Sequence, residues 1–460
     1  MTIVAGDLKF IASERMIDNL STVAGVGGGG RMSQTEVVDG TENNVFPDVM
    51  PGDRVAGVVQ LRQVYPIVLS ADNSTLYNAK SGVLERPTDA NVEVAAFVAP
   101  GTLSAQAAAA VGTKWTTEES DNASSVSGSV VMDIGAAVPA VGDLVSVVEP
   151  AYIYYSSGSY TQPRADRGKR IVTGVSGSTL TLDGSAITPS SFWPEWPGYS
   201  VKVLTAANTT GTRVSAVSHL TAAVAAAATT ITVDKLWAAV QLPDATTIDT
   251  AGEPSGRRGT LPLYLPGDQL LIEYGSTREA AVVASVNHST GVITLTAGLA
   301  NAFASGAKVT RPLELGQLQA AANNVFAQQT WTRAWSDAAI GAGISARYSG
   351  AITMSNKGGA TDRWACVFTS STQFNLISER LGQIATGNVG TDFLPLNPMT
   401  SEPYFTLLAT GWGSGWLPGN VLRFNTRAAS APIWLSRLVK PSAAAGTVQA
   451  TLFLRGDVDA

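Results

Sequence analysis

A β-strand pattern occurs twice in the middle of the chain. Each copy has an apolar strand, then a Gly-Asp turn that opens a second strand, a third strand, and a closing strand after a polar turn. The turn aspartates are Asp143 in one copy and Asp268 in the other. Alternating apolar positions separated by such turns are typical of half-buried antiparallel strands. The pattern predicts two small barrels or sandwiches, β module 1 at residues 125–205 and β module 2 at residues 206–314.

The remaining segments also favour strands. Residues 1–100 alternate strand and turn signals and are predicted to form an N-terminal β-rich assembly domain, followed by a linker at 101–124. Residues 315–460 are predicted to hold a helix and then a C-terminal β domain. The expected fold is therefore mainly β, with several small antiparallel β-barrel or sandwich modules and one or two short helices.

Two segments are candidates for helices. Residues 103–111 are rich in Ala, and residues 315–335 are rich in Ala, Gln and Asn. Ala and Gln have high helix propensity, so we expect a short helix in the first segment and a longer one in the second. The three strands predicted after residue 420 are expected to form one final sheet.

Charge and composition exclude several classes of protein. Only 14% of the residues are charged, against about 25% in an ordinary soluble domain, and the net charge is −6. A nucleic-acid binder would need a concentrated basic face, so we expect no nucleic-acid partner. A single cysteine, Cys366, leaves no disulfide framework and no Cys-based zinc cluster, and only two histidines are present. We predict no cofactor, no metal and no catalytic residue.

The chain has no apolar run long enough to span a membrane, and its first ten residues contain Asp7 and Lys9 instead of an apolar leader segment. We therefore expect no membrane insertion, and we expect the chain to be synthesised in a cytoplasm.

Aromatic side chains gather in three places: a Tyr-rich insertion in β module 1, a Trp-Pro loop after it, and a Gly/Trp segment near residue 414. Tyr and Trp concentrate binding energy at the centres of interfaces, so these rings are candidate partner contacts, and packing into the core is the alternative. The candidates are Tyr152, Tyr154, Tyr155, Trp193, Trp196, Trp412 and Trp416.

One carboxylate has a setting that could support catalysis. Glu195 lies between Trp193 and Trp196, and aromatic rings can both bind sugar faces and raise a carboxyl pKa by desolvation. Glycoside hydrolysis needs a second carboxylate, which Asp166 or Glu149 would supply. A Pro-rich packed loop explains the same residues more simply, so a receptor-binding, glycan-binding or glycan-degrading protein that uses this loop is the alternative interpretation.

Motifs at both ends of the chain carry a family resemblance. They lie at residues 7–15, 28–32, 37–40, 43–48, 53–54 and 61–62, and again at 422–426, 432–437 and 454–459. Together they resemble a family of tail and baseplate structural proteins of tailed bacteriophages, over about the first 90 and the last 40 residues.

The resemblance implies a virion structural protein in the tail, at the baseplate or tail tip. It implies a homo-oligomer, a trimer or a hexamer, that contacts other tail proteins and the host surface. A tail connector or a head-decorating protein is the further alternative.

Overall fold

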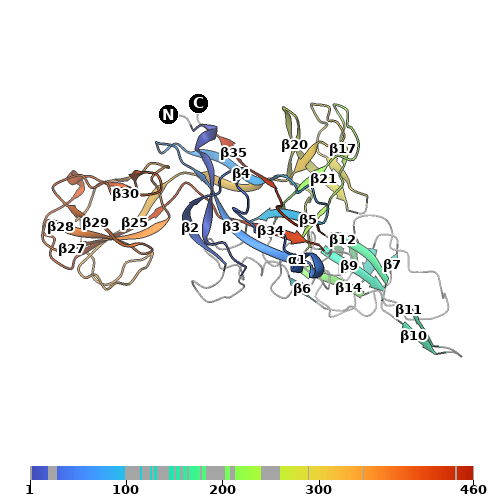
Figure 1. Cartoon of the computed structure of the whole chain (residues 1–460), viewed down its shortest axis with the longest axis horizontal. Coiled ribbons are helices and arrows are strands. Elements are labelled where there is room, and N and C mark those ends of the chain that lie inside the picture. The colour runs from blue at the N-terminus through green and yellow to red at the C-terminus, as the bar shows by residue number, and fades with distance from the viewer. Residues whose placement is uncertain are drawn as a thin grey trace.

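The structure is a computed structural model of the 460-residue chain. It describes residues 3–18, 28–98, 213–239, 260–288, 290–344, 347–440 and 443–458, together with the backbone of short strands between residues 114 and 207. The fold is mainly β, as predicted, and is built from several antiparallel sheets. The described residues contain one α-helix, α1 (Pro51–Ala56), which begins with a proline at its first position. Figure 1 shows a central body with lobes extending to both sides.

The central body, here called the hub, combines both ends of the chain in two sheets. Its larger sheet has the order β15-β5-β34-β3-β1-β2, and its smaller sheet has the order β24-β4-β35. The strands are β1 (Leu8–Arg15), β2 (Gly29–Glu36), β3 (Val58–Val68), β4 (Leu76–Glu85), β5 (Val92–Phe97), β15 (Val214–Ser215), β24 (Leu313–Leu318), β34 (Ile433–Val439) and β35 (Thr451–Asp457). Figure 1 shows the red C-terminal strands lying among the blue N-terminal ones.

The hub core lies between these two sheets. Val64 and Leu435 of the larger sheet are in the same buried cluster as Val83 and Leu313 of the smaller one. β34 pairs with β3 on one side and with β5 on the other, so the C-terminal strand is internal to the sheet. The N-terminal segment therefore has no complete core without the last thirty or so residues.

The expectation of one final sheet is wrong. The three strands after residue 420 belong to three different sheets: β33 (Val421–Arg427) to a separate lobe, and β34 and β35 to the two sheets of the hub. Alternation identifies a strand, but it does not identify the partner of that strand.

The two predicted β modules have the same strand order. Five strands of module 1 run β14-β9-β12-β13-β8, and the five strands at the same chain positions in module 2 run β23-β20-β21-β22-β17. Both modules also have a register shift at the same place, at Val172/Gly174 in one and at Val283/Ser285 in the other. Shared topology and a shared bulge indicate that the sequence repeat is a structural duplication.

The module strands have the following bounds. Module 1 has β6 (Lys114–Thr116), β7 (Ser125–Val126), β8 (Ser129–Val131), β9 (Leu144–Glu149), β12 (Ala165–Ser176), β13 (Thr179–Leu182), β14 (Lys202–Ala207) and the inserted hairpin of β10 (Tyr152–Tyr155) and β11 (Ser159–Gln162). Module 2 has β16 (Val217–His219), β17 (Thr230–Thr232), β18 (Trp237–Ala239), β19 (Thr260–Pro262), β20 (Gln269–Tyr274), β21 (Thr277–Asn287), β22 (Val292–Leu295) and β23 (Lys308–Thr310).

Module 2 shares a hydrophobic core with the hub. Leu61, Phe97 and Trp434 of the larger hub sheet are in one buried cluster with Leu270 and Ile272 of β20. Because these side chains lose contact with water only when the two units are packed together, the cluster fixes module 2 against the hub.

Residues 321–427 form a further unit, here called the distal lobe, which Figure 1 shows at the end of the molecule away from the modules. Its main sheet has the order β25-β33-β27-β28-β29. Besides β33, the strands of the lobe are β25 (Ala321–Gln328), β26 (Ile352–Thr353), β27 (Asp362–Phe368), β28 (Gln373–Ser378), β29 (Gly382–Asn388), β30 (Leu396–Asn397), β31 (Glu402–Pro403) and β32 (Thr406–Leu407). Its core is rich in aromatic rings, including Trp364, Phe374 and Phe405.

The helix predicted at residues 315–335 is absent. The segment instead contains the end of β24, then β25, then a loop. Leu313 and Leu318 are buried, and Gly316 and Asn324 have positive φ values of 76° and 53°, which a helix does not tolerate. Pairing of β24 with β4 and of β25 with β33 outweighs the helix propensity of Ala and Gln. The other predicted helix, at 103–111, lies outside the described residues.

Candidate functional site

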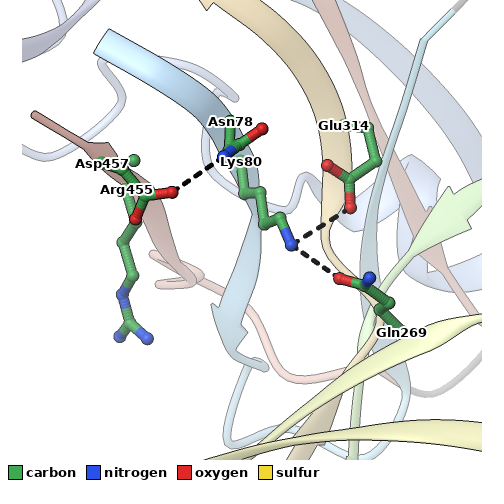
Figure 2. Close-up of a pocket in the computed structure, with 7 residues that line it drawn as sticks. Asn78, Lys80, Gln269, Glu314, Arg455 and Asp457 are labelled. Atoms are coloured by element: carbon green, nitrogen blue, oxygen red, sulfur yellow. Dashed lines mark hydrogen bonds and ion pairs between the residues drawn. The ribbon is translucent and has the colours of Figure 1, made fainter.

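An open polar cleft lies where the hub meets module 2. It has a volume of about 450 Å³. Its lining comes from β4 and β35 of the hub, from β24, and from Gln269 at the start of β20; the lining residues are Asn78, Lys80, Gln269, Glu314, Arg455, Gly456 and Asp457. Figure 2 shows Lys80 extending toward Glu314 and Gln269, with Asn78 beside Asp457 and the Arg455 guanidinium pointing away from the other labelled side chains.

The polar groups of the cleft bind one another. Lys80 Nζ lies 2.8 Å from Gln269 Oε1 and 3.4 Å from Glu314 Oε1, as the dashed lines of Figure 2 mark. Asn78 Nδ2 donates to Asp457 Oδ2 at 2.9 Å. The lining thus holds two cations and two carboxylates, so the cleft has no net charge to attract an ion.

Further ion pairs extend this contact along the hub surface. Arg455 donates to Glu273 of β20 at 2.9 Å, Arg86 pairs with Asp234 at 2.6 Å, and Lys308 pairs with Glu85. Each pair joins a hub residue to a module 2 residue. The cleft is therefore part of an electrostatic joint that holds the two units in one orientation.

Glu93 is a half-buried carboxylate of the joint that is shared by two lysines. Its two oxygens lie 2.7 Å from Lys235 Nζ of module 2 and 3.1 Å from Lys440 Nζ of the hub. Burial opposes ionisation of Glu93, but the two ammonium groups outweigh that effect and lower the pKa of its carboxyl. Burial lowers the pKa of Lys235, and Glu93 partly offsets this. Both groups are held in their charged forms by each other.

A second joint connects the hub to the distal lobe. Arg31 Nη2 of β2 lies 2.7 Å from Glu379 Oε2, and Arg380 Nη1 donates to the Met32 carbonyl at 2.5 Å. The fully buried Asn356 donates to Ser70 Oγ at 2.9 Å and accepts from Ala320 N–H at 2.8 Å. The distal lobe is therefore anchored to the hub by side chains as well as by the two chain crossings.

Two of the predicted contact residues belong to the distal lobe core. Trp416 is 1% exposed and its ring stacks on Phe368 with centroids 4.1 Å apart. Trp412 packs against the same cluster, edge-to-face with Tyr348 at 4.7 Å. Their positions favour core packing, the alternative that the sequence left open for these two rings.

The other predicted contact residues are described less fully. The strand β10 (Tyr152–Tyr155) carries Tyr152, Tyr154 and Tyr155 and pairs with β11, so the tyrosine insertion is a β-hairpin. Trp193, Glu195 and Trp196 lie outside the described residues. The glycan-degrading alternative therefore stays a prediction, which loss of saccharide cleavage in Glu195→Gln would test.

Sequence reasoning missed an aromatic loop in the distal lobe. Trp331 and Trp335 face each other edge-to-face with centroids 5.0 Å apart, on the loop that follows β25. Both residues lie in the segment 315–335, for which the sequence predicted a helix. Trp331 and Trp335 stand four residues apart, which is also the spacing of one helical face, so the sequence held no signal that distinguishes this loop from the predicted helix.

Other chemical groups in the described part of the chain are in structural settings. Cys366 is fully buried, and burial raises the pKa of its thiol, which keeps it protonated and inert. Within the described ranges, no three His, Cys, Asp or Glu side chains are grouped so as to hold a metal ion. None of the helices that the structure describes is long and apolar enough to cross a membrane.

The comparisons with known proteins return nothing to set beside this geometry: no protein-family model matches the chain, and no curated protein matches its sequence.

Proposed function

We propose that this chain is a non-enzymatic structural component of a bacteriophage tail, a part of the baseplate or tail tip that assembles with copies of itself and contacts other tail proteins. The proposal combines the motifs at the chain ends with the architecture of the hub. The observation that carries it is the hub itself, in which the two segments with the tail-protein resemblance interlock in shared sheets.

The joints support a mechanical role. Module 2 shares a core with the hub and is tied to it by ion pairs, and the distal lobe is held by Arg31 and Asn356. Packed cores and multiple joints keep separate lobes in fixed relative positions, which an assembly part needs and a flexible chain of domains lacks.

Unpaired strand edges support assembly with other chains. Among the strands that the structure describes, β2 ends the larger hub sheet and β29 ends the distal lobe sheet, whereas residues 342–344 bond to part of the outer side of β25. A strand edge offers free backbone N–H and C=O groups, which a neighbouring subunit can pair with or cover. A closed ring of three or six copies would cover such edges without producing open filaments.

Fractionation of purified virions tests the proposal. The chain should be present in the virion proteome, should separate with tails after heads and tails are dissociated, and should occur there in a multiple of three copies. Recovery with the heads or at the neck would instead indicate a decoration or connector protein. Absence from virions would refute a structural role in the particle.

A further inference from the structure

The loop after β25 presents two tryptophan rings and an arginine at the surface of the distal lobe. Trp331 and Trp335 are half-buried and lie edge-to-face at 73°. Arg333, midway between them, is exposed and has a φ of 61°. A positive φ is uncommon for a residue with a side chain, and such strain persists where the surrounding structure imposes it.

Arg423 binds both ends of this loop. It is 3% exposed and donates to the Ser336 carbonyl at 3.0 Å, to the Ala338 carbonyl at 2.8 Å and to Gln328 Oε1 at 2.7 Å. The backbone N–H of Trp331 also donates to the Gly419 carbonyl at 2.9 Å. The rings are thus held before any ligand arrives, which lowers the entropy cost of binding.

The tip of the loop carries one uncompensated positive charge. Within the part of the chain that the structure describes, the Arg333 guanidinium has no ion-pair partner. The nearest acid along the chain is Asp337, whose carboxylate binds Arg363 at 2.7 and 3.0 Å and accepts from Asn425 at 2.7 Å. Asp337 is therefore already neutralised, and Arg333 is available to an anion from outside.

We infer that Trp331, Arg333 and Trp335 form a binding site for an acidic glycan, a saccharide that carries carboxylate groups. Aromatic faces pack against the apolar C–H face of a sugar ring, and a guanidinium binds a carboxylate through two parallel hydrogen bonds. The inference goes beyond the structural role proposed above and does not depend on it.

The size of the site favours a glycan over a protein partner. The apolar part of the surface is two half-buried rings and the 63% exposed Leu417, two residues before the Gly419 whose carbonyl accepts from Trp331. A stable protein interface buries roughly 1,600 Å² in total, which such a small group of side chains does not supply. One or two sugar rings match its extent.

Calorimetric titration of the full-length protein tests the inference. The probes are alginate, polygalacturonate, hyaluronan and polysialic acid oligosaccharides, with uncharged dextran oligosaccharides for comparison. We expect binding to at least one acidic probe and at least tenfold weaker binding to dextran. Arg333→Gly should reduce the acidic affinity at least tenfold, while glycine relieves the positive φ and leaves the fold intact.

The matched control is Arg427→Ala. Arg427 is an exposed arginine of the same lobe at the opposite end of β33 from this loop, and its removal should leave binding unchanged. Trp335→Ala should weaken binding of the acidic probe as Arg333→Gly does. Trp335→Phe should retain most of the affinity of the unaltered protein.

Three results would overturn the inference. They are the absence of binding to every acidic probe, equal affinity for dextran, and an Arg333→Gly variant that binds the acidic probe as tightly as the unaltered protein. Failure of virion assembly in Arg333→Gly without any glycan binding would identify the loop as a contact between chains.

Discussion

Arg437 shows how the hub tolerates a charge inside its sandwich. It is 1% exposed, yet its guanidinium donates to Gln60 Oε1 and to the Pro47 carbonyl and lies over the Phe46 ring, 4.9 Å from its centroid. Burial, together with the positive charge of Arg62, lowers the pKa of Arg437 to about 10. The group therefore remains protonated at neutral pH, and the hydrogen bonds that surround it are structural.

Removing this guanidinium should be costly. We predict that Arg437→Met lowers the free energy of unfolding by about 3 kcal/mol, because the oxygen of Gln60 is left buried without a donor. Urea denaturation followed by circular dichroism measures the change. As a control, Lys9→Met removes an exposed ion pair with Glu36 and should cost less than about 1 kcal/mol. Similar losses of unfolding free energy in Arg437→Met and Lys9→Met would show that the buried Arg437 contributes no more to stability than an exposed ion pair.

The limits of prediction at this scale are visible in the tryptophans. Composition identified Trp412 and Trp416 as rings of interest, but the same residue type serves a core and an interface, and only the packed structure assigns Trp416 to the core. Arg423 and Arg333 could not be distinguished in the sequence either. One is enclosed by loop carbonyls and the other is exposed, and both environments are created by residues distant in the chain.

Between elements, the joint of the hub and module 2 depends on the ionised form of Glu93. Because its pKa in the folded protein is lowered below the ordinary value of 4.5, the stabilisation is present above pH 4.5 and is lost as the pH falls through the lower folded value. We predict that Glu93→Gln lowers the free energy of unfolding by about 2 kcal/mol at pH 7. The difference from the unaltered protein should shrink as the pH falls below 4.5.

Equilibrium unfolding at pH 7 and at pH 3 checks this prediction. Glu314→Gln is the matched control, because Glu314 pairs with Lys80 across the cleft but its side chain is 54% exposed. It should change stability by less than about 1 kcal/mol at either pH. A Glu93→Gln effect that is the same at both pH values would contradict the assignment of the joint to an ion pair.

Element identity was easier to predict than element pairing. The two modules were visible in the sequence because turn residues and alternation are local signals, and the shared strand order agrees with that repeat. The helix expected at 315–335 was wrong because tertiary pairing of β24 and β25 outweighs local propensity. Leu313 and Leu315 follow a strand alternation, but the register shifts at Gly316 put Leu318 out of step with them, so the strand signal is broken in the sequence.

At the scale of the whole molecule, the hub should depend on the last strand of the chain. β35 pairs with β4, and Ser81 Oγ donates to the Phe453 carbonyl at 2.7 Å. We predict that deletion of residues 450–460 destabilises the hub by about 4 kcal/mol or more, because Phe453 and Leu454 leave the core. Scanning calorimetry should show a lower Tm, whereas deletion of residues 459–460 alone should leave it unchanged. An unaltered Tm in the longer deletion would contradict the interlocked hub.

We propose that this interlocked molecule is a part of a phage tail. Immunogold labelling of intact virions with an antibody to the chain, viewed by electron microscopy, tests it most directly. We expect gold at the distal end of the tail. Particles that carry no gold on any accessible surface, and whose proteome lacks the chain, would contradict it.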